Sequence, residues 1–360
     1  MQIDKKMRLT KFSYKNADWE IEDLHLQPVN LIVGENATGK SRTLAQIDRF
    51  VKLLTQQDNS IGKDEWEVQF VTKNKESLKY ILKTLKTKVF EEYLWLNDKL
   101  IIERKKGDTF VKIRGNTQQK NWIQYSPPPK KLAIYSFRDI EKFPYSEAIL
   151  EWAENSYGFE FSYPSKYDFL KDSLLNSIED TTESFTGLTK KQQSAVVENL
   201  NIIGFNIKEI VIRKYDQNDA KYLLIDEKNV NKYMFLSDLS QGMARCITLI
   251  VYVEFLIRKK TPAAIVIDDF GEGLDYLRAT ALGKMLFKRC LEYNIQLIAT
   301  SNDSFLMNVV DIDYWNVLIR DGKTVKAINI ENHPDIFEDF RFEGTSNFNF
   351  FASSYLPSRL

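Results

Sequence analysis

Hydrophobic residues near the start of the chain follow a strand pattern that then changes to a helical one. The runs MRLTKFSY, DWEIEDLHL and VNLIVGE alternate apolar with polar residues or are mainly apolar, which predicts strands over the first forty residues. From there, Leu44, Ile47, Val51 and Leu54 recur at helical spacing. We therefore expect a strand-rich start that leads into an amphipathic helix, and this first unit covers residues 1–60.

The segment that follows mixes strand and helix signals. Within 66–114, LKYILKTLKTKVF fits an amphipathic helix as well as strands. The run EYLWLNDKLIIERKKGDTFVKIR, however, has two β-rich halves about Asn97 and Asp98, a pair that favours a tight turn. We predict an antiparallel β-meander over 61–140, which ends with the break SPPP and a short strand, LAIYSF. Helical patterns in YDFLKDSLLNSI and KKQQSAVVENLNII predict an inserted helical lobe over 141–200.

Strands and helices alternate regularly in the last third. IKEIVIRKY and KYLLIDE are typical of strands, and a long apolar helix over 243–257 follows them. Next come the strand AAIVIDD, the helix LRATALGKMLFKRCLEY, the strand IQLIAT and the short helix SFLMNVV. This order predicts an α/β fold with a parallel sheet covered by helices on both faces. We expect 201–330 to form this α/β lobe, the aromatic tail 331–360 to pack on the body or a partner, and 1–360 to be one domain.

Composition narrows the class of protein. Lys plus Arg and Asp plus Glu both number 50 in 360 residues, so net charge gives no support to a strongly basic nucleic-acid-binding protein. No apolar stretch approaches the roughly 20 residues of a membrane span, and the start MQIDKKMRL lacks the apolar run of a signal peptide. We expect a cytoplasmic protein without a membrane partner. Cys246 and Cys290 lie in apolar helical patterns and are expected to be buried free thiols.

The strongest chemical signal is the run GENATGKS, which follows the apolar stretch VNLIV and opens a helical segment. This spacing and context are those of a phosphate-binding P-loop rather than of a chance glycine turn. Backbone N–H groups between the glycines form an anion nest, and the helix N-terminus adds its dipole. We expect ATP and Mg²⁺ as cofactors, with Lys40 reaching the β- and γ-phosphates and Ser41 a metal ligand. The predicted nucleotide-binding residues here are Gly34, Glu35, Asn36, Ala37, Thr38, Gly39, Lys40, Ser41 and Arg42.

A second signal is the run AAIVIDDFGEGLD, in which an apolar strand ends in two carboxylates. The strand places Asp268 and Asp269 at the carboxyl edge of the sheet beside the P-loop, the arrangement of a Walker B motif. Asp268 is expected to hold Mg²⁺, and Asp269 to orient the attacking water as a catalytic group together with Lys40. A solvated turn or a helix cap is the alternative interpretation.

A third run, LSQGM at 239–243, directly precedes the long helix. Alone it would be an ordinary Ser-capped helix start. The order P-loop, LSQGM, Asp pair and the Gly-Leu-Asp turn at 273–275 nevertheless resembles the ABC-type ATPases. Within them the chain is most similar to the soluble SMC-like, RecF-like and OLD-type P-loop ATPases of the AAA family found in bacterial defence modules. The strong motifs cover about a third of the chain.

The resemblance implies a fold, a site and partners. The fold is a P-loop NTPase with an ABC/SMC-like head, an N-terminal antiparallel β-subdomain and an inserted helical lobe. In the family, a signature motif such as Ser240, Gln241 and Gly242 binds the ATP of a second subunit, so we expect a homodimer or higher oligomer that sandwiches nucleotide. A separately encoded effector protein is a further expected partner by analogy, and nucleic acid is a candidate.

Two departures from the family bear on catalysis. Asp269 stands where the family usually has Glu, and the shorter side chain is expected to slow hydrolysis. Ser301 replaces the switch His after the next strand, so Ser301 or Asn302 is left to sense the γ-phosphate through a neutral hydrogen bond. Both departures favour a nucleotide-gated switch or sensor over a high-turnover motor.

Weaker candidates and other functions stay open at this point. Arg138 occupies roughly the place of the glutamine-loop contact, and Trp19 or Tyr14 could stack on adenine, although core packing is the commoner role of an aromatic. Basic clusters could contact a nucleic-acid backbone, namely Lys79, Lys83, Lys86 and Lys88, and Arg104, Lys105 and Lys106. The leading function is an ATPase that gates a partner effector or DNA in anti-phage defence or genome maintenance. The alternatives are a transporter's nucleotide-binding subunit and a non-hydrolysing scaffold.

Overall fold

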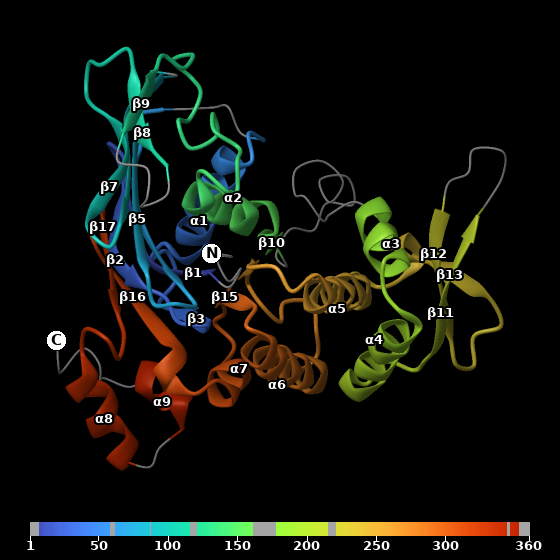
Figure 1. The fold of residues 1–360 in the computed structure, drawn as a ribbon. Coiled ribbons are helices and arrows are strands. Elements are labelled where there is room, and N and C mark those ends of the chain that lie inside the picture. The colour runs from blue at the N-terminus through green and yellow to red at the C-terminus, as the bar shows by residue number, and fades with distance from the viewer. Residues whose placement is uncertain are drawn as a thin grey trace.

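A computed structural model describes residues 7–57, 62–86, 88–115, 121–160, 178–214, 221–343 and 346–352. Within these residues one sheet of fourteen strands runs through the molecule (Figure 1). Its strands, in spatial order, are β10 (Tyr157–Glu160), β14 (Ala264–Asp268), β15 (Gln296–Thr300), β3 (Val29–Val33), β16 (Trp315–Asp321), β17 (Thr324–Ile328), β2 (Glu20–His25), β1 (Met7–Lys15), β4 (Glu65–Thr72), β5 (Ser77–Leu85), β6 (Lys88–Leu96), β7 (Lys99–Arg104), β8 (Val111–Arg114) and β9 (Trp122–Tyr125).

One end of this sheet is parallel. Neighbours in the series β10, β14, β15, β3 and β16 all pair in parallel, so their carboxyl ends meet at one edge. Strand β3 is buried along its whole length, as expected of an apolar strand covered on both faces. The predicted parallel sheet is therefore confirmed, and its edge is where ligands bind in folds of this type.

The rest of the sheet is mainly antiparallel. Strands β4 to β9 follow one another as a meander, so the choice of strands over a helix within 66–114 is confirmed. Asn97 and Asp98 connect β6 to β7 and both have positive φ, 44° and 67°, which a tight hairpin turn requires.

Helices cover both faces of the parallel part. Side chains alternate along β14, with Ala264 and Val266 in one core cluster and Ile265 and Ile267 in the other. The first cluster includes the apolar face of α1 (Lys40–Leu54), against which α2 (Pro144–Glu154) packs. The second includes α5 (Gln241–Lys259), α6 (Tyr276–Tyr293) and α7 (Ser304–Val309).

A smaller lobe extends to one side of the parallel part (Figure 1). It consists of α3 (Ile178–Thr186), α4 (Lys190–Ile203) and an antiparallel sheet of β11 (Ile207–Lys214), β12 (Lys221–Glu227) and β13 (Tyr233–Phe235). Both helices pack on α5 and on this sheet. The predicted helix in KKQQSAVVENLNII is confirmed as α4, whereas YDFLKDSLLNSI lies almost wholly outside the described residues.

The structure corrects two parts of the predicted organisation. Residues 144–160 do not belong to a helical lobe, because α2 packs on α1 and β10 extends the main sheet beside β14. The run LAIYSF forms turns rather than a strand. The reason is tertiary: the backbone N–H groups of Ala133 and Ile134 donate to the buried Glu92 carboxylate at 2.6 and 2.9 Å, in place of a strand partner.

The aromatic tail packs on the body as predicted. The short turns Leu236–Asp238 and Ile312–Tyr314 precede α5 and β16, and α8 (Pro334–Glu343) and α9 (Asn347–Ala352) close the described chain. Phe337, Phe340 and Phe350 are buried, and Phe350 contacts the other two and Trp315. Cys246 and Cys290 are buried free thiols, which confirms that prediction. No helix of the described residues is long and apolar enough to cross a membrane.

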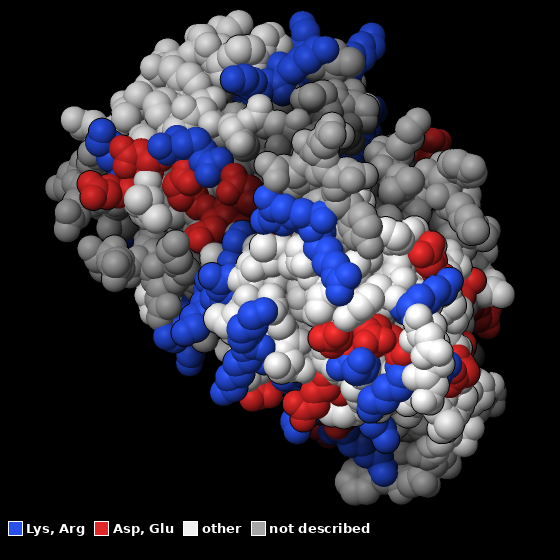
Figure 2. Space-filling view, turned by 90° about the vertical axis from the view of Figure 1, so that its right-hand side faces the viewer, with Lys and Arg blue, Asp and Glu red and all other residues white. Residues whose placement is uncertain are grey.

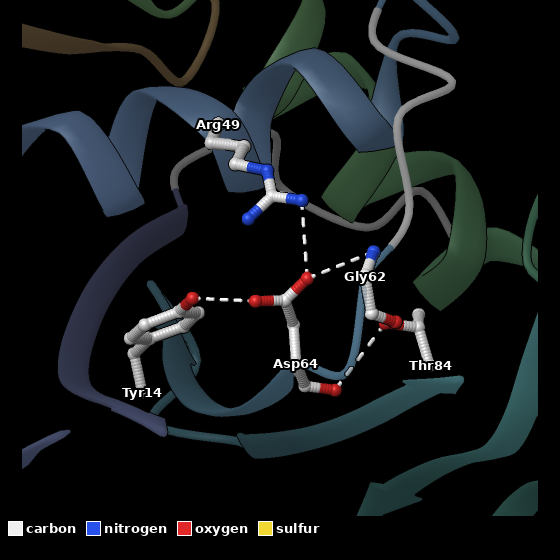
Figure 3. A network of polar contacts seen from close by, with 5 residues as sticks. All are labelled: Tyr14, Arg49, Gly62, Asp64 and Thr84. Atoms are coloured by element: carbon white, nitrogen blue, oxygen red, sulfur yellow. Dashed lines mark hydrogen bonds and ion pairs between the residues drawn. The ribbon is translucent and has the colours of Figure 1, made fainter. Parts of the chain in front are cut away.

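A buried polar network fixes α1 to the meander (Figure 3). The Tyr14 hydroxyl donates to Asp64 Oδ1 at 2.5 Å, while Arg49 Nη2 and the Gly62 N–H both lie 3.1 Å from Asp64 Oδ2. The Thr84 hydroxyl donates to the Gly62 carbonyl at 3.0 Å. Because Arg49 belongs to α1, this network holds the helix that begins at the P-loop against β1, β4 and β5.

Candidate nucleotide-binding site

The P-loop leaves the carboxyl end of β3 and closes on the start of α1. A Cβ on Gly34 would lie 2.7 Å from Thr38 Oγ1 and 3.0 Å from the Leu318 carbonyl, so only glycine fits there. Gly39 has φ +102°, which favours glycine as well. At the loop tip, Arg320 Nη1 donates to the Ala37 carbonyl at 3.1 Å. The two glycines therefore allow the curled backbone that a phosphate nest needs.

Lys40 lies folded over this loop. Its Nζ donates to the carbonyls of Gly34 at 2.7 Å and Glu35 at 3.0 Å. Burial lowers the pKa of the Lys40 ammonium, and the carboxylates of Asp269 and Asp268 act in the opposite direction. A buried cation between a glycine-rich nest and two carboxylates fits a polyphosphate with its metal ion.

Neighbouring residues of α1 complete the predicted nucleotide set. Ser41 and Arg42 are exposed in the first turn, and the Arg42 guanidinium lies 5.0 Å from the ring centroid of Trp19. Trp19 and Tyr14 are almost wholly buried, so both aromatic side chains belong to the core and are not surfaces for adenine. Ser41 and Asp268 carry oxygen atoms of the hard kind that suits Mg²⁺ alongside phosphate oxygens.

The Walker B turn is tied to the end of the adjacent strand. The Thr300 hydroxyl donates to Asp268 Oδ1 at 2.6 Å and accepts the Asp269 N–H at 2.8 Å. Asp269 itself has φ +49°, in the left-handed region. Thr300 is a site residue that the sequence analysis missed, since a Thr at the end of an apolar strand carries no signal of its own.

Ser301 and Asn302 take different places in the turn after β15. The Ser301 side chain is buried, and its hydroxyl donates to the Phe270 carbonyl while accepting the Asp303 N–H, both at 3.1 Å. Asn302 is exposed, and its Nδ2 donates to Asn36 Oδ1 at 3.2 Å. Of the two predicted γ-phosphate contacts, the structure brings Asn302 to the P-loop and ties Ser301 to the Walker B turn.

The signature run begins α5. Ser240 is its N-cap, with Oγ accepting the Met243 N–H at 3.4 Å, and Ser240 and Gln241 are both exposed. A Cβ on Gly242 would lie 2.6 Å from the Gly273 carbonyl and 2.9 Å from Leu274 Cδ2. The start of α5 is thus packed directly on the turn that follows the Walker B strand.

The weaker candidates fare differently. Arg138 forms ion pairs with Glu147 at 2.7 Å and Glu154 at 2.9 Å, and the strand beside β14 is β10 rather than the segment leading to Arg138. Lys79 pairs with Glu67 at 2.6 Å, and carboxylates likewise face Lys83 and Lys105. Figure 2 faces the side of the molecule with α3, α4 and β11 to β13, where Lys and Arg also lie among Asp and Glu. The carboxylates beside Lys79, Lys83 and Lys105 offset part of the charge of the basic clusters.

The fold and site define a P-loop NTPase with an ABC/SMC-like head. The chain matches the family described as "AAA domain, putative AbiEii toxin, Type IV TA system" over residues 29–308, and it belongs to that family. Its members and this fold bind nucleotide, typically with Mg²⁺. No curated protein matches the chain.

Several solved structures are similar to the chain. One is an SMC head bound to the C-winged helix domain of ScpA, at 13% identity over 89% of this chain and 96% of that chain, with a TM-score of 0.52. Another is the SMC head domain from Thermotoga maritima, at 15% identity over 89% and 98%, with a TM-score of 0.45. A third is an SMC head with an extended coiled coil bound to the C-terminal domain of ScpA from Pyrococcus furiosus, at 12% identity over 93% and 100%, with a TM-score of 0.48.

Proposed function

We propose that this protein is a slowly hydrolysing ATPase that acts as a nucleotide-gated switch. The observation that carries the proposal is the meeting of three turns at one sheet edge: the P-loop, the Asp268–Asp269 turn and the turn with Asn302. ATP is the nucleotide we assign to this edge. The output is control of a separately encoded effector or of DNA, in bacterial anti-phage defence or genome maintenance, and the family description supports the defence context.

Each side chain at the site has its own role in ATP hydrolysis. Lys40 exchanges its bonds to the Gly34 and Glu35 carbonyls for phosphate oxygens. Mg²⁺, when bound by Ser41 and Asp268, neutralises charge on the phosphates. Asp269 orients the attacking water and accepts its proton, and ADP leaves as the β–γ bond breaks. The Asn302 amide donates a hydrogen bond to the γ-phosphate.

Slow turnover follows from the same residues. The Asp269 side chain is one methylene shorter than that of Glu, so its carboxylate reaches the water less well. Asn302 supplies a neutral amide donor, which gives less charge stabilisation in the transition state than a charged donor. A site that binds ATP well and hydrolyses it slowly keeps the ATP-bound state populated, which is what a switch requires.

Two other functions make different predictions. A non-hydrolysing scaffold would bind ATP without converting it, so single-turnover hydrolysis separates it from the switch. A transporter's nucleotide-binding subunit is not favoured by the family or by the long meander, and co-purification of a membrane partner would support it.

The test of the switch is ATP-driven association. Ser240 and Gln241 begin α5 with an exposed helix N-terminus, which we assign to the phosphate of a second copy. With ATP and Mg²⁺, light scattering should show a rise in mass or small-angle X-ray scattering a more compact assembly, most clearly for Asp269→Asn, which traps ATP. ADP should be much less effective, because the γ-phosphate supplies contacts that offset the ordering cost of association.

The matched control is an Arg placed on the smaller lobe. Ser240→Arg should block association, whereas Ser194→Arg, on an exposed position of α4, should leave it unchanged. Identical mass and shape for the wild type with ATP, with ADP and without nucleotide would reject the sandwich.

A further inference from the structure

The last residue of β15 contacts the Walker B turn through three hydrogen bonds. Thr300 is fully buried. Its hydroxyl accepts the Asp269 N–H at 2.8 Å and donates to Asp268 Oδ1 at 2.6 Å, and its carbonyl accepts the Phe270 N–H at 2.8 Å. One residue of the neighbouring strand therefore holds three consecutive residues of the turn that carries both acids.

The direction of these bonds is fixed by chemistry. A backbone N–H can only donate, so the Thr300 oxygen must accept from Asp269. The single hydroxyl proton is then directed to Asp268, whose ionised carboxylate can only accept. The chain from the Asp269 N–H through the Thr300 hydroxyl to Asp268 Oδ1 thus has one orientation, and it leaves Asp268 Oδ2 outside the bond.

The contact matters because the turn is not a relaxed one. Asp269 has φ +49°, a left-handed conformation that persists when the surroundings hold it. Strands β14 and β15 pair in parallel with Ile267 opposite Ala299, which places Thr300 beside Asp268 at the sheet edge. The hydroxyl fixes the backbone N–H of Asp269 and the rotation of the Asp268 carboxylate at the same time.

We infer that Thr300 is the positioning residue for the metal-binding and water-orienting acids of this site. It touches neither nucleotide nor metal; it acts by orienting Asp268 and Asp269. The inference rests on the proposed function, because it assigns these acids to Mg²⁺ and to the attacking water. Replacing a residue that hydrogen-bonds and orients a metal ligand typically lowers metal affinity or activity by about 10–100-fold.

The test compares two replacements that separate the hydroxyl from the shape of the side chain. Thr300→Val keeps the β-branched shape and removes both hydrogen bonds of the hydroxyl, whereas Thr300→Ser keeps the hydroxyl and removes the methyl group. Thr280→Val is the control, because the Thr280 hydroxyl donates to the Tyr276 carbonyl within α6. Thermal unfolding first establishes that each variant is folded.

The main readout is the Mg²⁺ dependence of nucleotide affinity, measured with a fluorescent ATP analogue, followed by single-turnover hydrolysis. For Thr300→Val we expect affinity without Mg²⁺ within about twofold of wild type, a roughly 10-fold higher Mg²⁺ requirement and hydrolysis slower by about 10–100-fold. Thr300→Ser should lie close to wild type in both. A Mg²⁺ requirement unchanged in Thr300→Val, or raised equally in Thr300→Ser, would overturn the inference.

The design also separates this inference from the proposed function. A wild-type protein that fails to bind ATP with Mg²⁺ refutes the proposed function. If the wild type binds ATP with Mg²⁺ and Thr300→Val has the same Mg²⁺ requirement, only the role of Thr300 is refuted. If Thr300→Val does not fold, Thr300→Cys replaces it under the same criterion, because a thiol is a weak donor and acceptor of similar size.

Discussion

Replacing Gly242 by alanine tests how tightly the signature helix is packed on the turn after the Walker B strand. The added Cβ would lie 2.6 Å from the Gly273 carbonyl and 2.9 Å from Leu274 Cδ2, against an ordinary contact distance of 3.4–4 Å. Leu274 can rotate away, but a backbone carbonyl cannot. The helix start and the turn must therefore separate by about 0.8 Å.

The expected magnitude follows from two opposing effects. Overpacking of this kind typically destabilises a protein by about 1–3 kcal/mol. Gly→Ala stabilises a helix interior by up to about 1 kcal/mol, and by less in the first turn, where Gly242 lies. The free energy of unfolding of Gly242→Ala should therefore fall by about 1–2 kcal/mol, which lowers Tm by roughly 1–3 °C for a chain of this size.

A second helical glycine provides the control. At Gly283 in α6 the added Cβ would meet Leu306 Cδ1 at 2.5 Å, which is the end of a flexible side chain. Gly283→Ala should therefore unfold at or near the wild-type temperature. Thermal unfolding without nucleotide, followed by circular dichroism, gives both values. A Gly242→Ala variant as stable as Gly283→Ala would refute the packing argument.

The remaining predictions concern the phosphate site and the thiols. Lys40→Ala should lose tight ATP binding, because the β- and γ-phosphates lose the ammonium that lies over the P-loop, and wild-type affinity in calorimetry would contradict the assignment. Burial lowers the pKa of Lys40 in the folded protein. The difference in free energy of unfolding between wild type and Lys40→Met, measured by denaturant titration, should therefore rise with pH up to about 10.4, the pKa of Lys in an unfolded chain. A difference that does not change with pH would refute this. Asp269→Asn should bind ATP and hydrolyse it about 10²–10⁴-fold more slowly, so normal turnover would move the role to another acid. Burial raises the pKa of Cys246 and of Cys290 to about 12, so neither should react with a thiol reagent at pH 8 until the protein unfolds, and fast labelling of the native protein would contradict their burial.

Local patterns predicted the strand, turn and helix context of the P-loop and of the Asp268–Asp269 run. The P-loop and the Asp268–Asp269 run each lie within one segment, where strand, turn and helix signals follow directly along the chain. The regular alternation of strands and helices likewise predicted the parallel sheet. These features depend on neighbours in sequence, which is the information that periodicity and motifs contain.

The missed features depend on neighbours in space. Thr300 contacts Asp268 because β15 pairs with β14, a pairing across about thirty residues of sequence. Whether Ser301 or Asn302 faces the P-loop depends on where β15 ends and the chain turns. A shift of this turn by one residue would exchange their places. The apolar run LAIYSF looked like a strand, and the buried carboxylate of Glu92 takes its N–H groups instead.

The contacts among the turns form a path from the predicted γ-phosphate contact to the start of α5. Asn302 bonds Asn36 at the P-loop tip, and the preceding residue, Ser301, bonds the Phe270 carbonyl in the Walker B turn. Three residues after Phe270, the Gly273 carbonyl packs against Gly242 at the start of α5. A γ-phosphate that takes the Asn302 amide from Asn36 therefore acts on a turn that packs on the surface we assign to a second copy. Asn302→Ala tests coupling along this path, because it removes the side-chain amide that bonds Asn36. Association should then no longer differ between ATP and ADP while ATP still binds, and an unchanged difference would refute the coupling.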